Sequence, residues 1–282
     1  MILPLLAMVV VAVAMAQNPT GDVVDVIMTV SVPSDVPVLE KRLEAFSELE
    51  GKHRGRFTAT ATADGLRGRF KFSGSTPKGF EDRLSALLAT RGALEFWACA
   101  TEPTDWLLAA AKQRWAARTG EQDDVLVNFG GAIPDSATLR GALRPPKLTE
   151  IIAAGWTDSE HRLVAVVAPA ALTRADVATA TLKEDPMSGE SVVALALTDR
   201  GRAEFGRITS RCVNRLLPIT FDGRAVMVPV VREPITGGVA HINLGPSNAE
   251  VTPREAQSVA AAAIVGGSLT GSVTLGVSPT ER

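Results

Sequence analysis

The sequence has little of what catalytic and metal sites are usually built from. Its 282 residues include two cysteines and three histidines. His53, His161 and His241 occur in unrelated segments and form none of the close pairs that bind zinc. It also lacks the glycine-rich loops that cradle nucleotides and the Gly-x-Ser-x-Gly motif of hydrolases. We therefore expect no enzyme, no metal site and no cofactor.

Charge and hydropathy exclude further classes. The formal net charge is −2, with acids and bases interspersed, so we expect no nucleic-acid partner. After residue 17 no apolar run approaches the roughly 20 residues that span a bilayer. The acidic segment Glu121, Asp123 and Asp124 lacks the alternating spacing of a calcium loop, and we interpret it as a solvated loop.

The N-terminus has the pattern of an export signal. Residues 1–16, MILPLLAMVVVAVAMA, carry no charged side chain and end in an Ala-x-Ala signature. This pattern predicts cleavage after Ala16 and a location outside the cytoplasm, in the periplasm or cell envelope. If it is not cleaved, the same segment would act as an N-terminal membrane anchor.

Residues 23–100 predict a ferredoxin-like base with βαββαβ order, because strand-like and helical apolar patterns alternate along them. A half-buried strand pattern around Met28 is followed by helical spacing, and a tight turn at Gly65 joins two more alternating segments. A second helical pattern precedes Leu94–Ala98, which we expect to be the last strand of this sheet. The expected core side chains are Phe46, Phe70, Leu84 and Phe96.

Residues 101–168 are interpreted as an insertion packed on the base, or as its connection to the following region. A helix is expected over Asp105–Arg118, stopped by Gly120, and a short strand over Val125–Phe129.

The two cysteines fall in different predicted subdomains. Cys99 ends a predicted base strand, whereas Cys212 lies on the apolar stripe of a later helix. A disulfide needs Cα atoms within about 7 Å, so we expect two buried free thiols. A disulfide remains the alternative for an exported chain.

The last third contains an ordered series of signals. LTRADVATA is followed by the strand-like SVVALALT, the helix DRGRAEFGRITSRCVN, a hairpin turning at Asp222-Gly223 and a PITGG turn. A helix with a Thr252/Glu255 capping box then ends in two glycines, and SLTGSVTLG closes the series. This order resembles the first extracytoplasmic domain of SecD, a membrane subunit of the protein-export machinery.

The resemblance implies an α+β protein with a smaller α+β head over 169–282, whose final strand Ser268–Leu275 returns to the base sheet. It also implies a non-catalytic, exported module that assists Sec-dependent translocation by contacting the emerging, unfolded polypeptide. The Sec translocon, or a full-length SecD or SecF, would be a further partner. The alternative is an extracytoplasmic interaction module that keeps the head fold but has left the Sec pathway.

One departure from the family pattern favours this alternative. The family usually has Ser-Ala-Pro after the hairpin, where this chain has Met227, Val228 and Pro229.

The hairpin Leu217–Val231 is the candidate polypeptide-binding surface, because an adaptable apolar strand with a methionine tolerates varied partners. Its candidate residues are Leu217, Phe221, Met227 and Val230. The alternative is that these side chains pack the head's own core. A second candidate surface is the arginine-rich helix, either a solvated face or a site for anionic headgroups or an acidic partner. Its residues are Arg200, Arg202, Arg207, Arg211 and Arg215.

Overall fold

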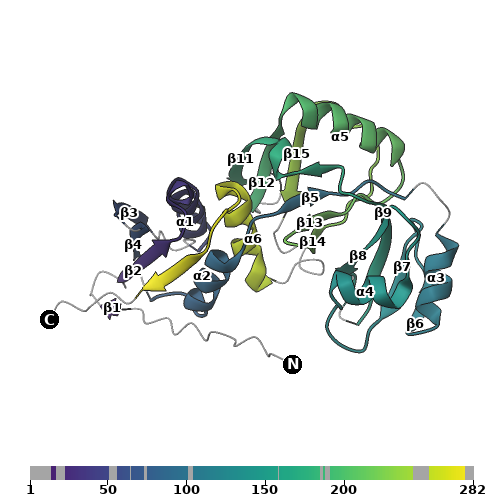
Figure 1. Ribbon diagram of the computed structural model, residues 1–282, viewed down its shortest axis with the longest axis horizontal. Coiled ribbons are helices and arrows are strands. Elements are labelled where there is room, and N and C mark those ends of the chain that lie inside the picture. The colour runs from purple at the N-terminus through teal and green to yellow at the C-terminus, as the bar shows by residue number, and fades with distance from the viewer. Residues whose placement is uncertain are drawn as a thin grey trace. The chain divides into compact units, whose positions relative to one another are not determined.

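In the computed structural model the protein forms two compact units (Figure 1). The first contains Met1–Arg91 and Gly266–Arg282, and the second contains Gly92–Val265. The structure describes residues 14–16, 23–50, 56–63, 65–72, 75–100, 104–157, 159–184, 187, 191–243 and 254–276. Both units mix helices with antiparallel sheet, which confirms the predicted α+β class. No helix in these ranges is both long and apolar enough to cross a membrane.

The first unit is a βαββαβ sandwich. Its sheet is antiparallel throughout, with β2 in contact with β4 on one edge and with β1 and β16 on the other, while β3 lies beyond β4. In Figure 1 the C-terminal strand β16, in yellow, lies beside β2, in purple. The elements are β1 (Ala14–Ala16), β2 (Val23–Val30), η1 (Pro33–Asp35), α1 (Val36–Glu50), β3 (Arg56–Thr62), β4 (Gly65–Lys71), α2 (Phe80–Ala89) and β16 (Val273–Gly276).

Helices α1 and α2 cover one face of this sheet because the strands alternate buried and exposed side chains. Phe70 of β4 lies 6.4 Å from Phe46 of α1 and 5.1 Å from Phe80 of α2, measured between ring centroids. Leu84 is fully buried in the same unit. Three of the four predicted core residues are thus confirmed as base core.

The predicted last strand of the base is wrong. β5 (Leu94–Phe96) lies in the second unit, where it pairs with β13 (Ile219–Phe221), and Phe96 packs on Phe205 with ring centroids 5.7 Å apart. The fourth base strand is instead β16, which pairs with β2. The sequence resemblance correctly implied that this strand returns to the base, whereas local periodicity does not say which sheet a short segment such as β5 joins.

A buried arginine closes the first unit. The Arg42 side chain is 0% exposed and donates to carbonyl oxygens on two separate segments. Its Nη1 reaches the Thr90 oxygen at 2.8 Å, its Nη2 reaches the Arg91 oxygen at 3.0 Å, and its Nε and Nη2 reach the Gly267 oxygen at 2.9 and 2.6 Å. The chain leaves this unit after Arg91 and re-enters it at Gly266. One guanidinium therefore binds both the departing and the returning segment.

The re-entering segment is held at a second point. Asp35, which is buried, accepts hydrogen bonds from the Thr270 and Gly271 amides at 2.9 and 2.7 Å and from the Thr270 hydroxyl at 2.8 Å. A Cβ at Gly266 would lie 2.2 Å from the Arg42 Cγ, so glycine is required there by close approach. Burial raises the pKa of Asp35, but these hydrogen bonds, with a smaller contribution from the Arg42 charge, hold that pKa below its ordinary 3.8.

The described residues of the second unit form three antiparallel sheets. They are ordered β10-β5-β13-β14, β11-β12-β15 and β6-β7-β9-β8. The elements are β5, α3 (Asp105–Lys112), β6 (Ala116–Thr119), β7 (Val125–Asn128), α4 (Ser136–Leu143), β8 (Thr149–Gly155), β9 (His161–Val167), β10 (Leu172–Thr173), η2 (Arg174–Asp176), β11 (Val177–Glu184), β12 (Ser191–Leu197), α5 (Asp199–Arg211), β13, β14 (Arg224–Met227), β15 (Val239–Asn243) and α6 (Arg254–Gly266).

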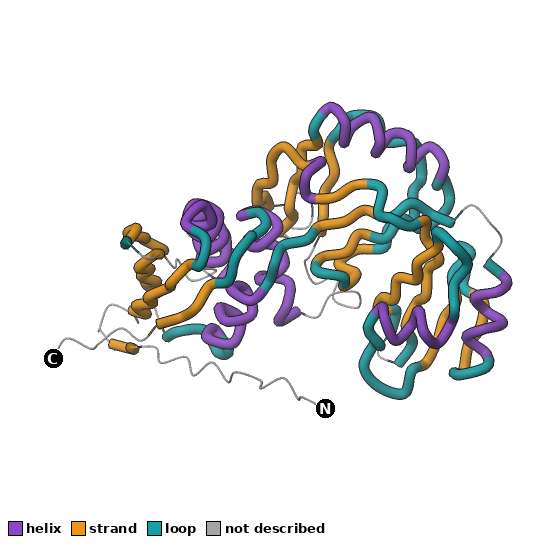
Figure 2. Tube along the Cα trace, in the orientation of Figure 1, coloured by secondary structure: helices purple, strands orange, loops and turns teal. Residues whose placement is uncertain are grey.

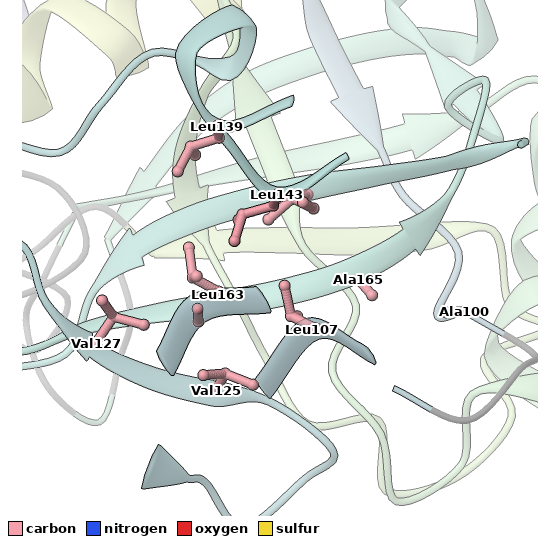
Figure 3. Close-up of a cluster of buried hydrophobic side chains, with 10 residues drawn as sticks. Ala100, Leu107, Val125, Val127, Leu139, Leu143, Leu163 and Ala165 are labelled. Carbon is pink, nitrogen blue, oxygen red and sulfur yellow. The ribbon is translucent and has the colours of Figure 1, made fainter. Parts of the chain in front are cut away.

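The expected insertion, 101–168, is an α+β layer of this second unit rather than a segment packed on the base. Helices α3 and α4 lie against the β6-β7-β9-β8 sheet (Figure 2), and Leu107, Leu139 and Leu163 meet in its core (Figure 3). The predicted strand at Val125 is confirmed. The predicted helix ends at Lys112, not Arg118, because the following residues form β6 and pair with β7.

Two parts of the sequence interpretation lie outside the described residues. They are the signal segment up to residue 13 and the Thr252 capping box. Ala14–Ala16 form β1, which pairs with the start of β2. Cleavage after Ala16 stays a prediction. Because β16 pairs with the other half of the same β2 edge, a cleaved chain would keep most of this sheet.

We expect the Arg42→Met variant to lose at least about 3 kcal/mol of unfolding free energy, since several buried carbonyls would lose their donor at about 1–3 kcal/mol each. Lys41→Met, next to it on the exposed side of α1, is the matched control and should change stability by less than about 0.5 kcal/mol. Amide hydrogen exchange in β2 and β4 measures the effect in this unit. Equal protection in the two variants would contradict the role of Arg42.

We also expect the first unit to lose stability in acid through Asp35. Its pKa is lower in the folded than in the unfolded chain, so its contribution is present above pH 3.8 and is lost as pH falls through the folded value. Asp35→Ala should be less stable than the parent chain at pH 6, and the two should converge towards pH 2. Urea unfolding at stepped pH measures this. A constant difference across that range would rule out the linkage.

Candidate polypeptide-binding site

The candidate hairpin is built around a tight turn. β13 and β14 are joined by Asp222 and Gly223, both with positive φ, 46° and 77°. This is the geometry that matches the strand twist of a two-residue hairpin. The Asp222 backbone N–H donates to the Ala93 oxygen at 2.8 Å, and its carboxylate accepts from the Ala93 N–H at 2.7 Å. The turn is therefore fixed to the chain segment that opens the second unit.

The structure separates the four candidate residues into two groups. Leu217 and Phe221 are only 2% and 6% exposed and lie in the interior of the unit. Met227 and Val230 are half-buried and reach the surface. The first pair packs the core, as the alternative interpretation expects, and only the second pair is accessible in this conformation. Polypeptide binding by these residues stays a prediction.

The accessible part is a short apolar strip, Met227–Val230, in which every residue is half-buried. Its backbone continues the hairpin, because Leu217 N–H donates to the Pro229 oxygen at 3.0 Å. Beneath it a cluster of buried side chains joins two sheets, with Trp97, Val228 and Val230 packed at its margin. The buried members are Ile152, Ala154, Val164, Val166, Leu216 and Ala225. The strip is thus an exposed edge of a well-packed layer.

Trp97 and Val228 were missed by sequence reasoning. Trp97 follows β5, and its indole N–H donates to the Thr220 hydroxyl at 2.9 Å, which in turn donates to a Glu95 carboxylate oxygen at 3.1 Å. This chain of polar contacts fixes the indole beside the strip. The sequence shows a tryptophan at this position, but it does not show that Thr220, 123 positions away, is its hydrogen-bond partner.

The two cysteines form a disulfide, so the expectation of free thiols is wrong. The Cα atoms of Cys99 and Cys212 are 5.8 Å apart. Cys99 lies shortly after β5, and Cys212 directly follows α5. The error came from assigning β5 to the base, which put the two thiols in different units. With β5 in the second unit, both cysteines are buried in the same unit.

The acidic segment and the histidines were the other candidates for a metal or catalytic site, and several of them contact other side chains of the fold. Asp124 is buried rather than solvated, and its carboxylate lies 2.6 Å from the Arg162 Nε, while Arg162 stacks over Trp156. His161 packs on Phe129, and burial lowers its pKa. His241 is exposed, and His53 lies outside the described residues. Within the described part of the chain no cluster of three or more His, Cys, Asp or Glu could hold a metal ion.

The arginine-rich helix is α5, and its outer face is charged as expected. Three of its arginines lie near acids within the unit, in the pairs Arg200–Asp176, Arg202–Asp199 and Arg207–Glu204. Arg215 follows the helix and lies 3.3 Å from Asp123. This pairing favours the interpretation of a solvated helix face over an anion-binding surface.

Comparison with known proteins agrees with the sequence resemblance. Residues 149–270 match the family model "SecDF, P1 head subdomain". The chain is 44% identical over 55 residues to the protein translocase subunit SecD of Acidaminococcus fermentans, covering 20% of this chain and 13% of that protein. It is 39% identical over 74 residues to SecDF of Thermus thermophilus, covering 26% and 10%. The matched segments therefore span about a tenth of these relatives.

Two solved structures are also similar, both with 22% sequence identity. One, described as a membrane component SecDF that enhances protein export, covers 91% of this chain and 99% of the solved chain with a TM-score of 0.43. The other, SecDF in a super-membrane-facing form, covers 89% and 29%, also with a TM-score of 0.43.

These matches show that part of the chain is similar to SecD and SecDF proteins, which are named as protein translocase subunits. More particularly, the similarity to the P1 head subdomain of SecDF covers residues 149–270. The match begins at β8 and so includes residues 149–168, which the sequence analysis assigned to the insertion or connector.

We expect the Cys99→Ala/Cys212→Ala variant to lose about 2–5 kcal/mol of unfolding free energy, because the bond closes a long loop in the unfolded chain. The two residues are 113 positions apart. Thermal unfolding with and without reductant measures the effect. Reductant should destabilise the parent chain by a similar amount and leave the variant unchanged. Two titratable thiols in the unreduced, unfolded parent would contradict the bond.

Proposed function

We propose that this chain assists Sec-dependent protein translocation by contacting the emerging, unfolded polypeptide through its P1-type head. The observation that carries the proposal is the match of residues 149–270 to the SecDF P1 head subdomain. Two relatives that are similar to part of this chain are named as protein translocase subunits. In this proposal the chain performs no chemistry. It binds the emerging polypeptide and then releases it.

The strip Met227–Val230 has the physical properties that such contact needs. Its side chains are half-buried and apolar, and methionine adapts its shape to different neighbours. The layer beneath is fixed by the hairpin turn, the Trp97 hydrogen bond and the disulfide, so little order has to be gained on binding. Contact through one short strip should be weak, with a Kd of roughly micromolar or higher, as a moving polypeptide requires.

The proposed setting is extracytoplasmic. The N-terminal signal pattern supports export to the periplasm or cell envelope, with membrane attachment if the signal is retained. The chain would bind unfolded exported polypeptides. It would also associate with the Sec translocon or with a full-length SecD or SecF.

The alternative is an extracytoplasmic interaction module that keeps the head but acts outside the Sec pathway. One observation favours it. Met227, Val228 and Pro229 replace the small turn of the family at the place where contact would occur. Crosslinking in the native cell separates the two proposals, because only a translocation module should be recovered with the Sec translocon.

We expect an unfolded export substrate, titrated into the purified chain, to shift the methyl NMR signals of Met227 and Val230 in the millimolar range or below. Met227→Ser and Val230→Ser should each weaken binding about two- to tenfold, because each removes part of a small apolar contact. Val239→Ser, a half-exposed valine of the same unit outside the strip, is the matched control.

The absence of any shift at Met227, Val230 and Phe221 at millimolar substrate would reject polypeptide binding at this hairpin. A shift that the Val239 variant weakens equally would show diffuse binding and reject the site.

A further inference from the structure

A hollow of about 450 Å³ lies at the end of α4, away from the residues used above. It is bounded by the last turn of α4, by the loop that leads to β8 and by the residues that follow β9. Five of its nine lining residues precede Thr149 and thus lie outside the P1 head match. The hollow is therefore mostly a property of this chain beyond the head segment.

The walls of the hollow are apolar. Pro145, Leu148 and Pro169 line it, and the Leu148 side chain is 75% exposed, the largest exposure among the leucines of the described residues. Leu148 is therefore mostly in contact with solvent and is not packed in the core. An apolar side chain brought by a partner would bury surface here.

The rim of the hollow is cationic. Glu150, 6% exposed at its base, is already neutralised by an ion pair with Arg140 and accepts the Ile151 N–H. Arg144 lines the hollow and Lys147 precedes Leu148, and both are exposed. Among the described residues neither forms an ion pair with an acid. The hollow thus offers positive charge that the fold itself does not use.

The loop that carries these groups is already ordered. Arg144 has φ 49° and caps α4, donating its N–H to the Arg140 oxygen at 2.9 Å. Thr149 N–H donates to the Pro146 oxygen at 3.2 Å, and Ala168 N–H donates to the Leu148 oxygen at 2.8 Å. A loop fixed before binding loses little conformational entropy when a partner arrives.

We propose that this hollow binds an acidic, extended polypeptide segment of a partner protein, in which carboxylates flank an apolar side chain. Guanidinium groups pair with carboxylates in two parallel hydrogen bonds, so Arg144 would fix a carboxylate at the rim. The apolar side chain would lie between Leu148 and Pro169. A bare phosphate or a lipid headgroup would satisfy the rim alone and leave the apolar walls exposed, which is why a polypeptide is the better match.

The test is fluorescence anisotropy of a labelled synthetic peptide in which aspartates alternate with leucines, with the full chain at low salt. A peptide with asparagine in place of every aspartate is the ligand control. Arg144→Gln should weaken binding about three- to tenfold. Lys112→Gln, an exposed cation on α3 outside the hollow, removes the same charge and should change binding less than twofold. Leu148→Asn, which suits the positive φ of 59°, should weaken it too.

Equal weakening by Arg144→Gln and Lys112→Gln, or no binding at millimolar peptide, would overturn the proposal. So would anionic phospholipid vesicles that bind through Arg144 while the peptide does not. Thermal unfolding of each variant shows whether it is folded. The proposal does not rest on the translocation assignment, because Met227→Ser and Val230→Ser should leave binding of the acidic peptide unchanged.

Discussion

The guanidinium of Arg42 is the group on which the arrangement of the chain depends most directly. It sits in the interior of the first unit and binds the carbonyls of Thr90 and Arg91, where the chain departs, and of Gly267, where it comes back. Everything from Gly92 to Val265 is inserted between these two points. Arg42 therefore holds together the two segments of the first unit between which the second unit is inserted, and Asp35 binds the next residues of the returning segment.

The second unit has its own long-range constraints, and they converge on the candidate binding strip. The disulfide joins the segment after β5 to the end of α5, while Asp222 fixes the hairpin turn to Ala93. Between these two anchors Trp97 is oriented by Thr220. The strip is accordingly a fixed surface with adaptable side chains, which differs from a flexible loop that must fold around its ligand.

Most elements could be predicted from local patterns. The alternation around Met28, the helical spacing that ends at Phe46 and the Asp222-Gly223 turn each depend on neighbouring residues, and the structure has them as expected. Pairings between distant segments could not be predicted this way. β5 and β16 are both short and apolar, and the partner of each is set by contacts far along the chain, so the first was placed in the wrong sheet and the disulfide was missed.

The burial of charged side chains also could not be predicted from the sequence. Arg42 and Asp124 look like ordinary surface residues in a sequence, because their hydrogen-bond and ion-pair partners are carbonyls and side chains that only the fold brings together. The candidate site shows the same limit in reverse. Leu217, Phe221, Met227 and Val230 share one apolar pattern, yet the first two face the interior and the last two the surface.

The pairing of β16 with β2 also sets the order in which the protein can assemble. The re-entering segment bonds to a partner 241 positions earlier, so the first sheet depends on contacts between segments far apart in the sequence. A chain that emerges N-terminus first presents β2, β3 and β4 long before their last strand exists, with half of one edge of β2 lacking the strand that pairs with it. The second unit, contiguous and crosslinked, can fold in that interval. The base is therefore the first part to emerge and the last to close, and in the meantime its open edge is the region most exposed to mispairing.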